Sequence, residues 1–450
     1  MATDTTTLSR ERYLIAPELL LDDMTPRSGW AAVVDGGRFA AVGPRGRLQA
    51  AHPELPVVTA PGRLLMPGLV DAHHHLTQAF GTAYAFGEPS EIFRRVWVPL
   101  EGALTEEEVY VSAQLAALES LRGGFTTVAD AGTRSAPGPR PVAEATAELG
   151  LRCVLAVACT DGSDALSPDQ AWNRASRHLD AVSGRDLVHG SVAVPVPESV
   201  SEPTLKALVE LCRERQVPLQ VHVNEHLVGV ERSLVTRGRR PLEYLDDAGA
   251  VGPWLLAAHT TLLTPEEALL LRDRGAAVSY NPVATSWKGN AVAPATLLAA
   301  LGVRMGLGTD GTRGDGFRLL DAAETAQRLG SAMAVGDPYA GRGRRWLRAG
   351  TQGGADALGL GAVVGRIAPG LAADYLLVDL DVPELVSTRD LVWELVRRGN
   401  RDLIEVVAVA GRPRLVDGWP PDFDREAFLH RTRRLATAAV TRAGLSGGPE

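Results

Sequence analysis

The sequence predicts an α/β fold in which a closed (β/α)8 TIM barrel is joined to a small β-sandwich. The barrel is predicted by eight short apolar runs between about residue 63 and residue 310, each followed by a turn and a segment of helical periodicity. Repeated units of this kind form a parallel sheet, and eight of them close it into a barrel. The sandwich is predicted by both ends of the chain, which contain short strand-like runs with Gly and Pro turns.

The eight runs and the helices between them can be assigned one by one. Strands are expected at residues 64–72, 125–130, 153–159, 188–195, 219–223, 254–259, 277–280 and 305–308. The clearest helices are expected at residues 106–122, 202–215, 265–274 and 294–301, several of them opened by a Ser or Thr in the capping position. In a barrel of this type, active-site residues lie where the strands end.

Length and composition fit one large catalytic domain and one smaller domain. The chain has 450 residues, of which 45% are hydrophobic and 22% charged, as in ordinary globular proteins. Residues 1–62 and 362–420 are expected to form the discontinuous β-sandwich, and residues 63–361 the catalytic barrel. Residues 421–450 are expected to form a charged helical tail.

Charge and cysteine content exclude several classes of function. The net charge is −8 and no basic run occurs, so neither a nucleic acid nor a membrane is expected as a partner. The N-terminus lacks a basic region and its first apolar stretch is broken by Pro17, so no signal peptide is expected. Three cysteines without a CxxC pair argue against a disulfide framework and a thiolate zinc site, and they indicate a reducing, cytoplasmic compartment.

A histidine-rich sequence stands at the end of the first predicted barrel strand, Asp71-Ala72-His73-His74-His75. Because side chains alternate along a strand, His73 and His75 are expected to project to one face, where they can chelate one ion, while His74 points away. Imidazole pairs suit zinc or ferrous iron. Packed or solvated histidines are the alternative explanation for such a pair on its own.

Three other predicted strands also end in residues that can bind a metal or transfer protons. His222 lies at the end of the fifth strand, with Glu225 just beyond it; His259 ends the sixth strand and Asp310 follows the eighth. His222 is expected to be a third ligand, and Glu225 to reach a substrate held at the metal. The coincidence of four such strand ends at one rim predicts a catalytic centre.

Five stretches of the chain, in this order, resemble the amidohydrolase superfamily: PGLVDAHHHL, HVNEH, AAHTTLLTPEE, GLGTDG and APGLAADYLLVDL. Within it, the chain is similar to the branch of aminohydrolases and chlorohydrolases that includes adenosine-analogue, guanine, cytosine and triazine enzymes. The resemblance covers nearly the whole chain.

The resemblance implies a mononuclear metal centre with catalytic residues beside it. The implied ligands of one divalent ion, Zn2+ or alternatively Fe2+, are His73, His75, His222 and Asp310. Glu225, His259 and Asp310 are the implied catalytic residues. The resemblance also implies the flanking β-sandwich and a homo-oligomer, a dimer or a tetramer.

The sequence also bears on two other kinds of metal site, a binuclear site and the zinc site of the cytidine-deaminase fold. Binuclear relatives usually bridge their metals with a carboxylated lysine that ends the fourth strand, but residues 187–198 contain no lysine; Lys206 and Lys288 lie elsewhere. Glu198 is a disfavoured alternative bridge. The HxE and PCxxC signature of the cytidine-deaminase fold is also absent.

Together with the implied catalytic residues, the resemblance implies hydrolytic deamination of an amino-substituted nitrogen heterocycle, such as a purine, pterin, pyrimidine or triazine. In this hypothesis a metal-bound hydroxide attacks the ring, Asp310 accepts the proton of the water, His259 stabilises the oxyanion and Glu225 protonates a ring nitrogen. One alternative is a hydrolase of the same fold that displaces halide or alkylamine, or opens a cyclic amide. A more remote alternative is a non-catalytic binding barrel.

Loop residues are the candidates for substrate binding. The segment 77–104, which follows the first barrel strand, carries Phe86 and Trp97, and further candidates follow the seventh and eighth strands. They are Asn281, Trp287, Lys288 and Arg313. The sequence after Asp310 lacks the Asn-containing loop of the commoner branch pattern, so the resemblance by itself does not imply a purine or nucleoside substrate. His226 is interpreted as a packed histidine, and the alternative is that it contacts the substrate or a residue of the metal site.

Overall fold

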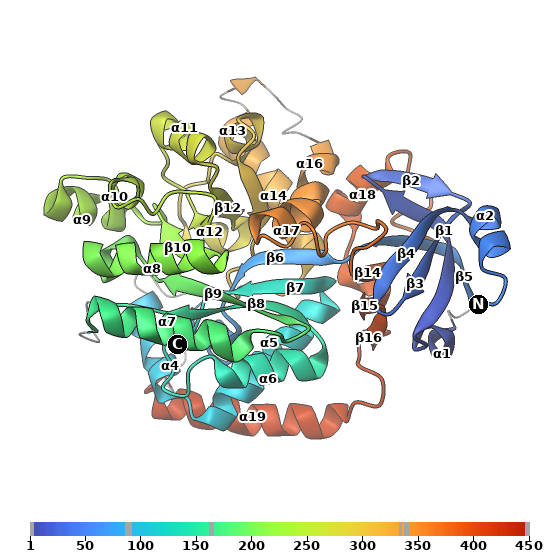
Figure 1. Cartoon of the computed structure of the whole chain (residues 1–450), viewed down its shortest axis with the longest axis horizontal. Helices are drawn as coiled ribbons and strands as arrows, with labels where there is room; N and C mark the ends of the chain where they lie inside the picture. Colours follow the sequence, from blue (N-terminus) through green and yellow to red (C-terminus); the bar gives the residue numbers. More distant parts are fainter. Residues whose placement is uncertain (1–3, 86–91, 162–165, 333–334, 337–341, 446–450) are drawn as a thin grey trace.

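The structure is a computed structural model that describes residues 4–85, 92–161, 166–332, 335–336 and 342–445. It contains a closed barrel of eight parallel strands surrounded by helices, with a second sheet at one side (Figure 1). This arrangement confirms the predicted (β/α)8 barrel, and the second sheet fits the small β-sandwich.

The barrel strands follow one another in chain order and close between the last strand and the first. Their bounds are β6 Leu69–His74, β7 Phe125–Asp130, β8 Arg152–Ala158, β9 Val188–Val194, β10 Leu219–Val223, β11 Leu255–His259, β12 Ala277–Tyr280 and β13 Arg304–Leu307. Each pair is parallel, so all eight carboxyl ends meet at one rim. The apolar runs therefore located seven strands to within one or two residues at each end.

The second sheet is built from both ends of the chain, in the order β16-β15-β14-β5-β1-β3-β4, with β2 paired to β1. The strands are β1 Arg12–Asp22, β2 Thr25–Ser28, β3 Trp30–Asp35, β4 Arg38–Pro44, β5 Val57–Pro67, β14 Tyr375–Asp379, β15 Ile404–Val409 and β16 Arg412–Val416. Side chains from six of them share one core, in which the hydroxyls of Tyr13 and Tyr375 lie 2.9 Å apart. The sheet thus encloses a core of its own.

The prediction of the first barrel strand at residues 64–72 was wrong for the first half of that range. Residues up to Pro67 belong to β5, which pairs with β1 and β14 in the second sheet. Gly68 separates β5 from β6, and a side chain there would overlap that of Thr126. Strand β5 also crosses the predicted domain boundary between residues 62 and 63. An unbroken apolar run conceals this change of sheet.

Helices follow the barrel strands around the outside. They are α5 Glu106–Arg122, α6 Arg140–Leu149, α7 Pro168–Val182, α8 Glu202–Arg215, α9 Leu227–Arg237, α10 Pro241–Asp247, α11 Pro265–Arg274, α12 Pro282–Lys288, α13 Ala295–Ala300 and α14 Gly316–Gln327. Thr105 and Thr264 form capping boxes with Glu108 and Glu267, which explains why α5 and α11 begin where the sequence predicts. None of the helices in these described ranges combines the length and apolarity needed to cross a bilayer.

Shorter helices fill the remaining connections. They are α1 Thr5–Leu8, α2 Arg45–Ala51, η1 Leu76–Gly81, α3 Thr82–Ala85, η2 Phe93–Trp97, α4 Val98–Ala103, η3 Pro197–Ser199, η4 Arg328–Ala332, α16 Arg342–Arg348, η5 Ala349–Gly353, α17 Gly354–Ala357, α18 Leu391–Arg398 and η6 Arg401–Leu403. The helical tail is α19 Arg425–Arg442, which lies along the barrel beside α4 and α5 (Figure 1). Phe428, Leu435 and Val440 bury its apolar face.

A buried ion pair joins the barrel to the second sheet. Arg152, at the start of β8, donates from Nε and Nη2 to the carboxylate of Asp374 at 3.1 Å each, and the two side chains are 3% and 1% exposed. The same carboxylate accepts the backbone N–H of Ala410. A buried pair of this kind leaves a costly unpaired charge when one partner is removed.

We therefore expect Asp374→Asn to lower the free energy of unfolding by about 3–5 kcal/mol. Urea denaturation measures the change. The control is Asp180→Asn, which breaks the exposed pair between Asp180 and Arg215 and should cost at most about 1 kcal/mol. Equal effects of the two substitutions would contradict the role assigned to Asp374.

Candidate metal centre and active site

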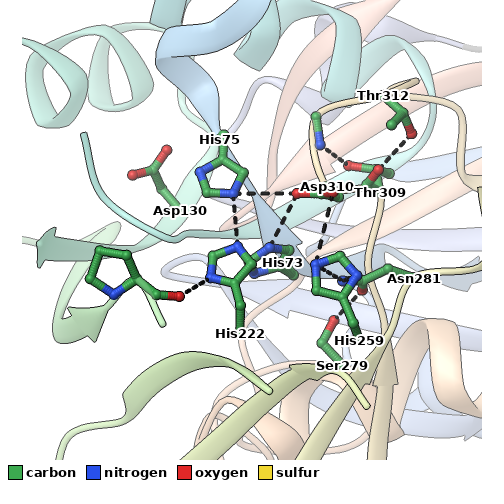
Figure 2. Close-up of polar contacts among 12 residues, drawn as sticks. His73, His75, Asp130, His222, His259, Ser279, Asn281, Thr309, Asp310 and Thr312 are labelled. Atoms are coloured by element: carbon green, nitrogen blue, oxygen red, sulfur yellow. Dashed lines mark hydrogen bonds and ion pairs between the residues drawn. The ribbon is translucent and has the colours of Figure 1, made fainter. Parts of the chain in front are cut away.

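Four of the predicted site residues converge at the carboxyl-terminal rim of the barrel. His73 lies in β6, His75 directly after it and His222 in β10, and Asp310 follows β13. Each offers one ligand atom, and these atoms all lie within 4.8 Å of one another (Figure 2). The structure thus brings together the ligand set that the sequence predicts.

The distances within this set match those between the ligands of one metal ion. Oδ1 of Asp310 lies 3.3 Å from Nε2 of His73 and 3.3 Å from Nε2 of His75. Nε2 of His75 is also 3.3 Å from Nε2 of His222. In a tetrahedral zinc site with bonds of about 2.0–2.2 Å, neighbouring ligand atoms lie about 3.4 Å apart.

Burial and hydrogen bonding also fit a metal. Both ring nitrogens of His73 are buried and make no hydrogen bond within the described residues. Nδ1 of His222 faces the carbonyl oxygen of Pro195 at 2.7 Å. By donating its proton there, the ring keeps the lone pair of Nε2 directed at the centre, as metal-binding histidines commonly do. Sequence reasoning did not identify Pro195, because a backbone carbonyl leaves no residue-type signal.

The charge states suit metal binding as well. Burial lowers the pKa of His73, and burial together with neighbouring histidines holds the pKa of His222 well below its usual range. Both imidazoles are therefore neutral, which is the form that binds metals. Burial alone would raise the pKa of Asp310, but Lys288 and the contacts with His73 and His75 hold it well below its usual range.

His259 lies beside this set and between two carboxylates. Its Nε2 is 3.7 Å from Oε2 of Glu225 and 3.9 Å from Oδ2 of Asp310. The side-chain nitrogen of Asn281 lies 3.3 Å from Nδ1 of His259, and its oxygen accepts a hydrogen bond from Ser279 at 2.8 Å. Burial lowers the pKa of His259 to about 3. The ring is therefore neutral and can donate a hydrogen bond towards the centre.

A buried carboxylate ties together the two strand ends that carry His73 and Asp310. Oδ1 of Asp71 accepts the N–H groups of His73 and Thr309 at 3.2 and 2.9 Å, and Oδ2 accepts the Thr309 hydroxyl at 2.5 Å. Burial raises the pKa of Asp71 to about 7. Sequence reasoning assigned no role to Asp71 or Thr309, although each is close to a predicted ligand in the sequence.

The backbone turns sharply where it presents these side chains. His259 and Asp310 have positive φ angles of +70° and +56°, and Asn224, which precedes Glu225, has +50°. Residues other than Gly seldom adopt this conformation, and such strain is concentrated at functional sites. Gly308 allows the rim to close, because a side chain there would overlap Asn281 and Ser279.

The residues predicted to bind substrate lie in different surroundings. Asn281 is fully buried against His259, and Lys288 reaches Glu225 and Asp310. Trp287 is 43% exposed, with the guanidinium of Arg313 5.6 Å from the centre of its ring. Trp97 packs on the hydrophobic core, over Gly81. Phe86 lies outside the described residues.

His226 is not the packed histidine that the sequence suggested. Its side chain is 49% exposed, and its Nε2 lies 3.1 Å from Oε1 of Glu225. Nδ1 contacts the side-chain oxygen of Asn290 at 3.1 Å. Strand β10 ends at Val223, so His226 lies in the loop and turns towards Glu225 rather than into the core.

Comparisons with known proteins agree with this geometry. A model of the amidohydrolase family matches residues 64–415, and a short match to an imidazolonepropionase-like composite domain of bacteria covers residues 33–54. A 5-methylthioadenosine/S-adenosylhomocysteine deaminase of Syntrophobacter fumaroxidans is 30% identical over 410 residues, which covers 90% of this chain and 92% of that protein.

Two solved structures show the same architecture. An adenosine deaminase of Xanthomonas campestris with bound zinc has a TM-score of 0.88 and 27% identity, and the match covers 95% of this chain and 98% of that one. Atrazine chlorohydrolase of Arthrobacter aurescens, complexed with zinc, has a TM-score of 0.84 and 21% identity, with 94% and 100% covered. The second match shows the shared fold alone.

Proposed function

Because the chain belongs to the amidohydrolase family and is a hydrolase of C–N bonds other than peptide bonds, we propose that it deaminates an amino-substituted nitrogen heterocycle. The observation that carries this proposal is the position of Glu225. Its carboxylate lies beside His259, next to the four-residue ligand set, where it can exchange a proton with a ring nitrogen. Relatives that are named as deaminases of adenosine compounds support the reaction.

We propose that His73, His75, His222 and Asp310 hold one divalent ion, and that this ion is zinc. Three imidazoles and one carboxylate are a donor set that zinc and ferrous iron both accept. Zinc is favoured by the zinc-bound adenosine deaminase that shares this fold. When bound, such an ion lowers the pKa of a water molecule from about 15.7 to about 7 and so supplies a nucleophile at neutral pH.

The remaining steps are proton transfers by the chain itself. Asp310 directs Oδ1 at the ligand set, and its Oδ2 lies 3.9 Å from Nε2 of His259, so this carboxylate can accept the proton of the attacking water and pass it to the leaving amine. The N–H of His259 stabilises the developing oxyanion. Glu225 protonates the ring nitrogen, which makes the amine-bearing carbon electrophilic. After the water oxygen has added to this carbon, the carbon–amine bond breaks, ammonia leaves, and the added hydroxyl loses its proton to solvent to give the carbonyl product.

Glu225 must take up a proton before it can donate one. Burial alone would raise its pKa, but His259 and Lys288 hold it well below its usual range, so the free carboxyl is ionised. His226 is half exposed and contacts Oε1 of Glu225. This contact provides a route from solvent to Glu225.

The proposed reaction is tested by the products formed from a panel of heterocycles. Zinc-loaded protein is incubated with adenosine, 5-methylthioadenosine, guanine, cytosine, a pterin and chlorinated and amino-substituted triazines. We expect one mole of ammonia per mole of product from at least one amine. Release of halide, alkylamine or a ring-opened acid without ammonia would favour the alternative hydrolases, and no reaction at all would favour a binding barrel.

Metal removal should abolish this activity. Dialysis against a chelator is expected to lower the rate of ammonia release by more than about 10²-fold, because the nucleophile is no longer formed at neutral pH. Adding zinc should restore the rate, whereas magnesium should not, since it prefers oxygen ligands. Full activity in protein shown by elemental analysis to be free of metal would contradict the mechanism.

A further inference from the structure

Lys288 is the final residue of α12 and reaches into the centre of the site. Its Nζ lies 2.8 Å from Oε1 of Glu225 and 2.6 Å from Oδ2 of Asp310, and its side chain is only 16% exposed. The same helix is preceded by Asn281, which contacts His259. The connection after β12 therefore delivers one side chain to the histidine and another to both carboxylates.

Glu225 and Asp310 each accept a hydrogen bond from the Lys288 ammonium with one carboxylate oxygen and direct the other oxygen at the reaction centre. Glu225 gives Oε1 to Lys288 and directs Oε2 at His259, 3.7 Å away. Asp310 gives Oδ2 to Lys288 and directs Oδ1 at His73 and His75. Two buried carboxylates this close repel each other, so a cation between them fixes both their separation and their rotation.

We propose that Lys288 is a positioning residue, whose ammonium holds Glu225 and Asp310 in the orientation that their proton transfers require. The inference rests on the proposed function. An ammonium has three N–H donors, and Glu225 and Asp310 take two of them. The charge-assisted hydrogen bonds are of the strong class that keeps a side chain in one geometry.

The same charge opposes metal binding. Lys288 donates to one oxygen of Asp310 while the other oxygen faces the ligand set, so the ammonium lies one carboxylate away from the position of the divalent ion. Like charges at a few ångströms weaken binding even when the effective dielectric constant is high. Removing the ammonium should therefore tighten metal binding while it slows the reaction. A residue that merely maintains the fold would move both quantities in the unfavourable direction.

The test compares Lys288→Met with wild type and with Lys206→Met. Methionine keeps the unbranched shape of the side chain, one atom shorter, and removes its charge. Lys206 is the only other lysine of the chain, and its side chain is 56% exposed on α8. The dissociation constant for zinc is measured by competition with a chromogenic chelator. Turnover is measured as ammonia release from the best amine of the panel.

For Lys288→Met we expect the dissociation constant for zinc to fall about tenfold or more. We expect kcat to fall roughly 10²-fold, the scale that a misplacement of about 1 Å produces. Lys206→Met should match wild type in both. Lys288→Arg retains a cation and should keep zinc affinity within about threefold of wild type, since the charge is what opposes the ion.

Any other combination of zinc affinity and kcat in Lys288→Met contradicts the positioning role. Weaker zinc binding together with slower turnover would indicate a structural residue, and Lys288→Arg would then share the defect. Tighter zinc binding with unchanged kcat would mean that the ammonium leaves the carboxylates during the reaction. Wild-type protein that binds zinc but acts on no amine would contradict the proposed function, and an unchanged zinc affinity in Lys288→Met would still contradict the role of Lys288.

Discussion

Replacing Asp310 with Asn is expected to lower kcat by about 10³-fold or more, because the side chain is proposed both to accept a proton and to bind the metal. Loss of a general base alone lowers a rate by about 10²–10⁴-fold. The substituted side chain would also be a weaker metal ligand, because an amide oxygen carries no net charge. Oδ1 of Asp310 lies 3.3 Å from two of the predicted ligand nitrogens, so both functions depend on one side chain.

Two measurements separate these two functions. Zinc content after dialysis reports on the ligand role, and kcat at saturating zinc reports on the proton transfer. Asp321→Asn, which removes a partly buried carboxylate on α14 outside the centre, is the matched control and should leave both unchanged. A near-wild-type kcat in Asp310→Asn at saturating zinc would contradict the role of Asp310 as proton acceptor.

Local sequence signals located seven of the eight barrel strands and the strand ends that carry the candidate ligands. Helices α5, α8 and α11 begin where Thr105, Ser201 and Thr264 accept hydrogen bonds from the first turn, and such caps are visible as residue types. His73, His222, His259 and Asp310 could be grouped before the structure was known, because the strands of a closed parallel barrel all end at one rim.

What the sequence did not reveal depends on contacts between distant segments. Pro195 orients His222 through a backbone carbonyl, which any residue possesses. Asp71 and Thr309 are 238 positions apart and meet only because β6 pairs with β13. Lys288 ends the short helix α12, and neither its spacing nor its neighbours in the sequence indicated that it would reach Asp310. At Gly68 the chain passes from the second sheet into the barrel, and because this point lies inside one apolar run, no change of residue type marks it.

Glu225→Gln is expected to lower kcat by about 10²–10⁴-fold while leaving zinc affinity within a few-fold of wild type. Glutamine keeps the shape of the side chain, and its amide oxygen can still accept a hydrogen bond from Lys288, but it cannot carry a proton to the ring nitrogen. Glu225 contributes no atom to the set formed by His73, His75, His222 and Asp310, so the ligand sphere should persist.

Glu198→Gln is the matched control for this prediction. Glu198, which the sequence left as a disfavoured alternative bridge, lies on η3 after β9 and is outside the groups of described residues that could hold a metal ion. In a mononuclear site its replacement should leave kcat and zinc content unchanged, with one zinc per chain in both variants. Two zinc ions per wild-type chain, one of them lost in Glu198→Gln, would replace the mononuclear assignment. A normal kcat in Glu225→Gln would contradict the role of Glu225 as the proton donor. A neutral heteroaromatic ring resists attack until its nitrogen is protonated, so deamination would then need another donor.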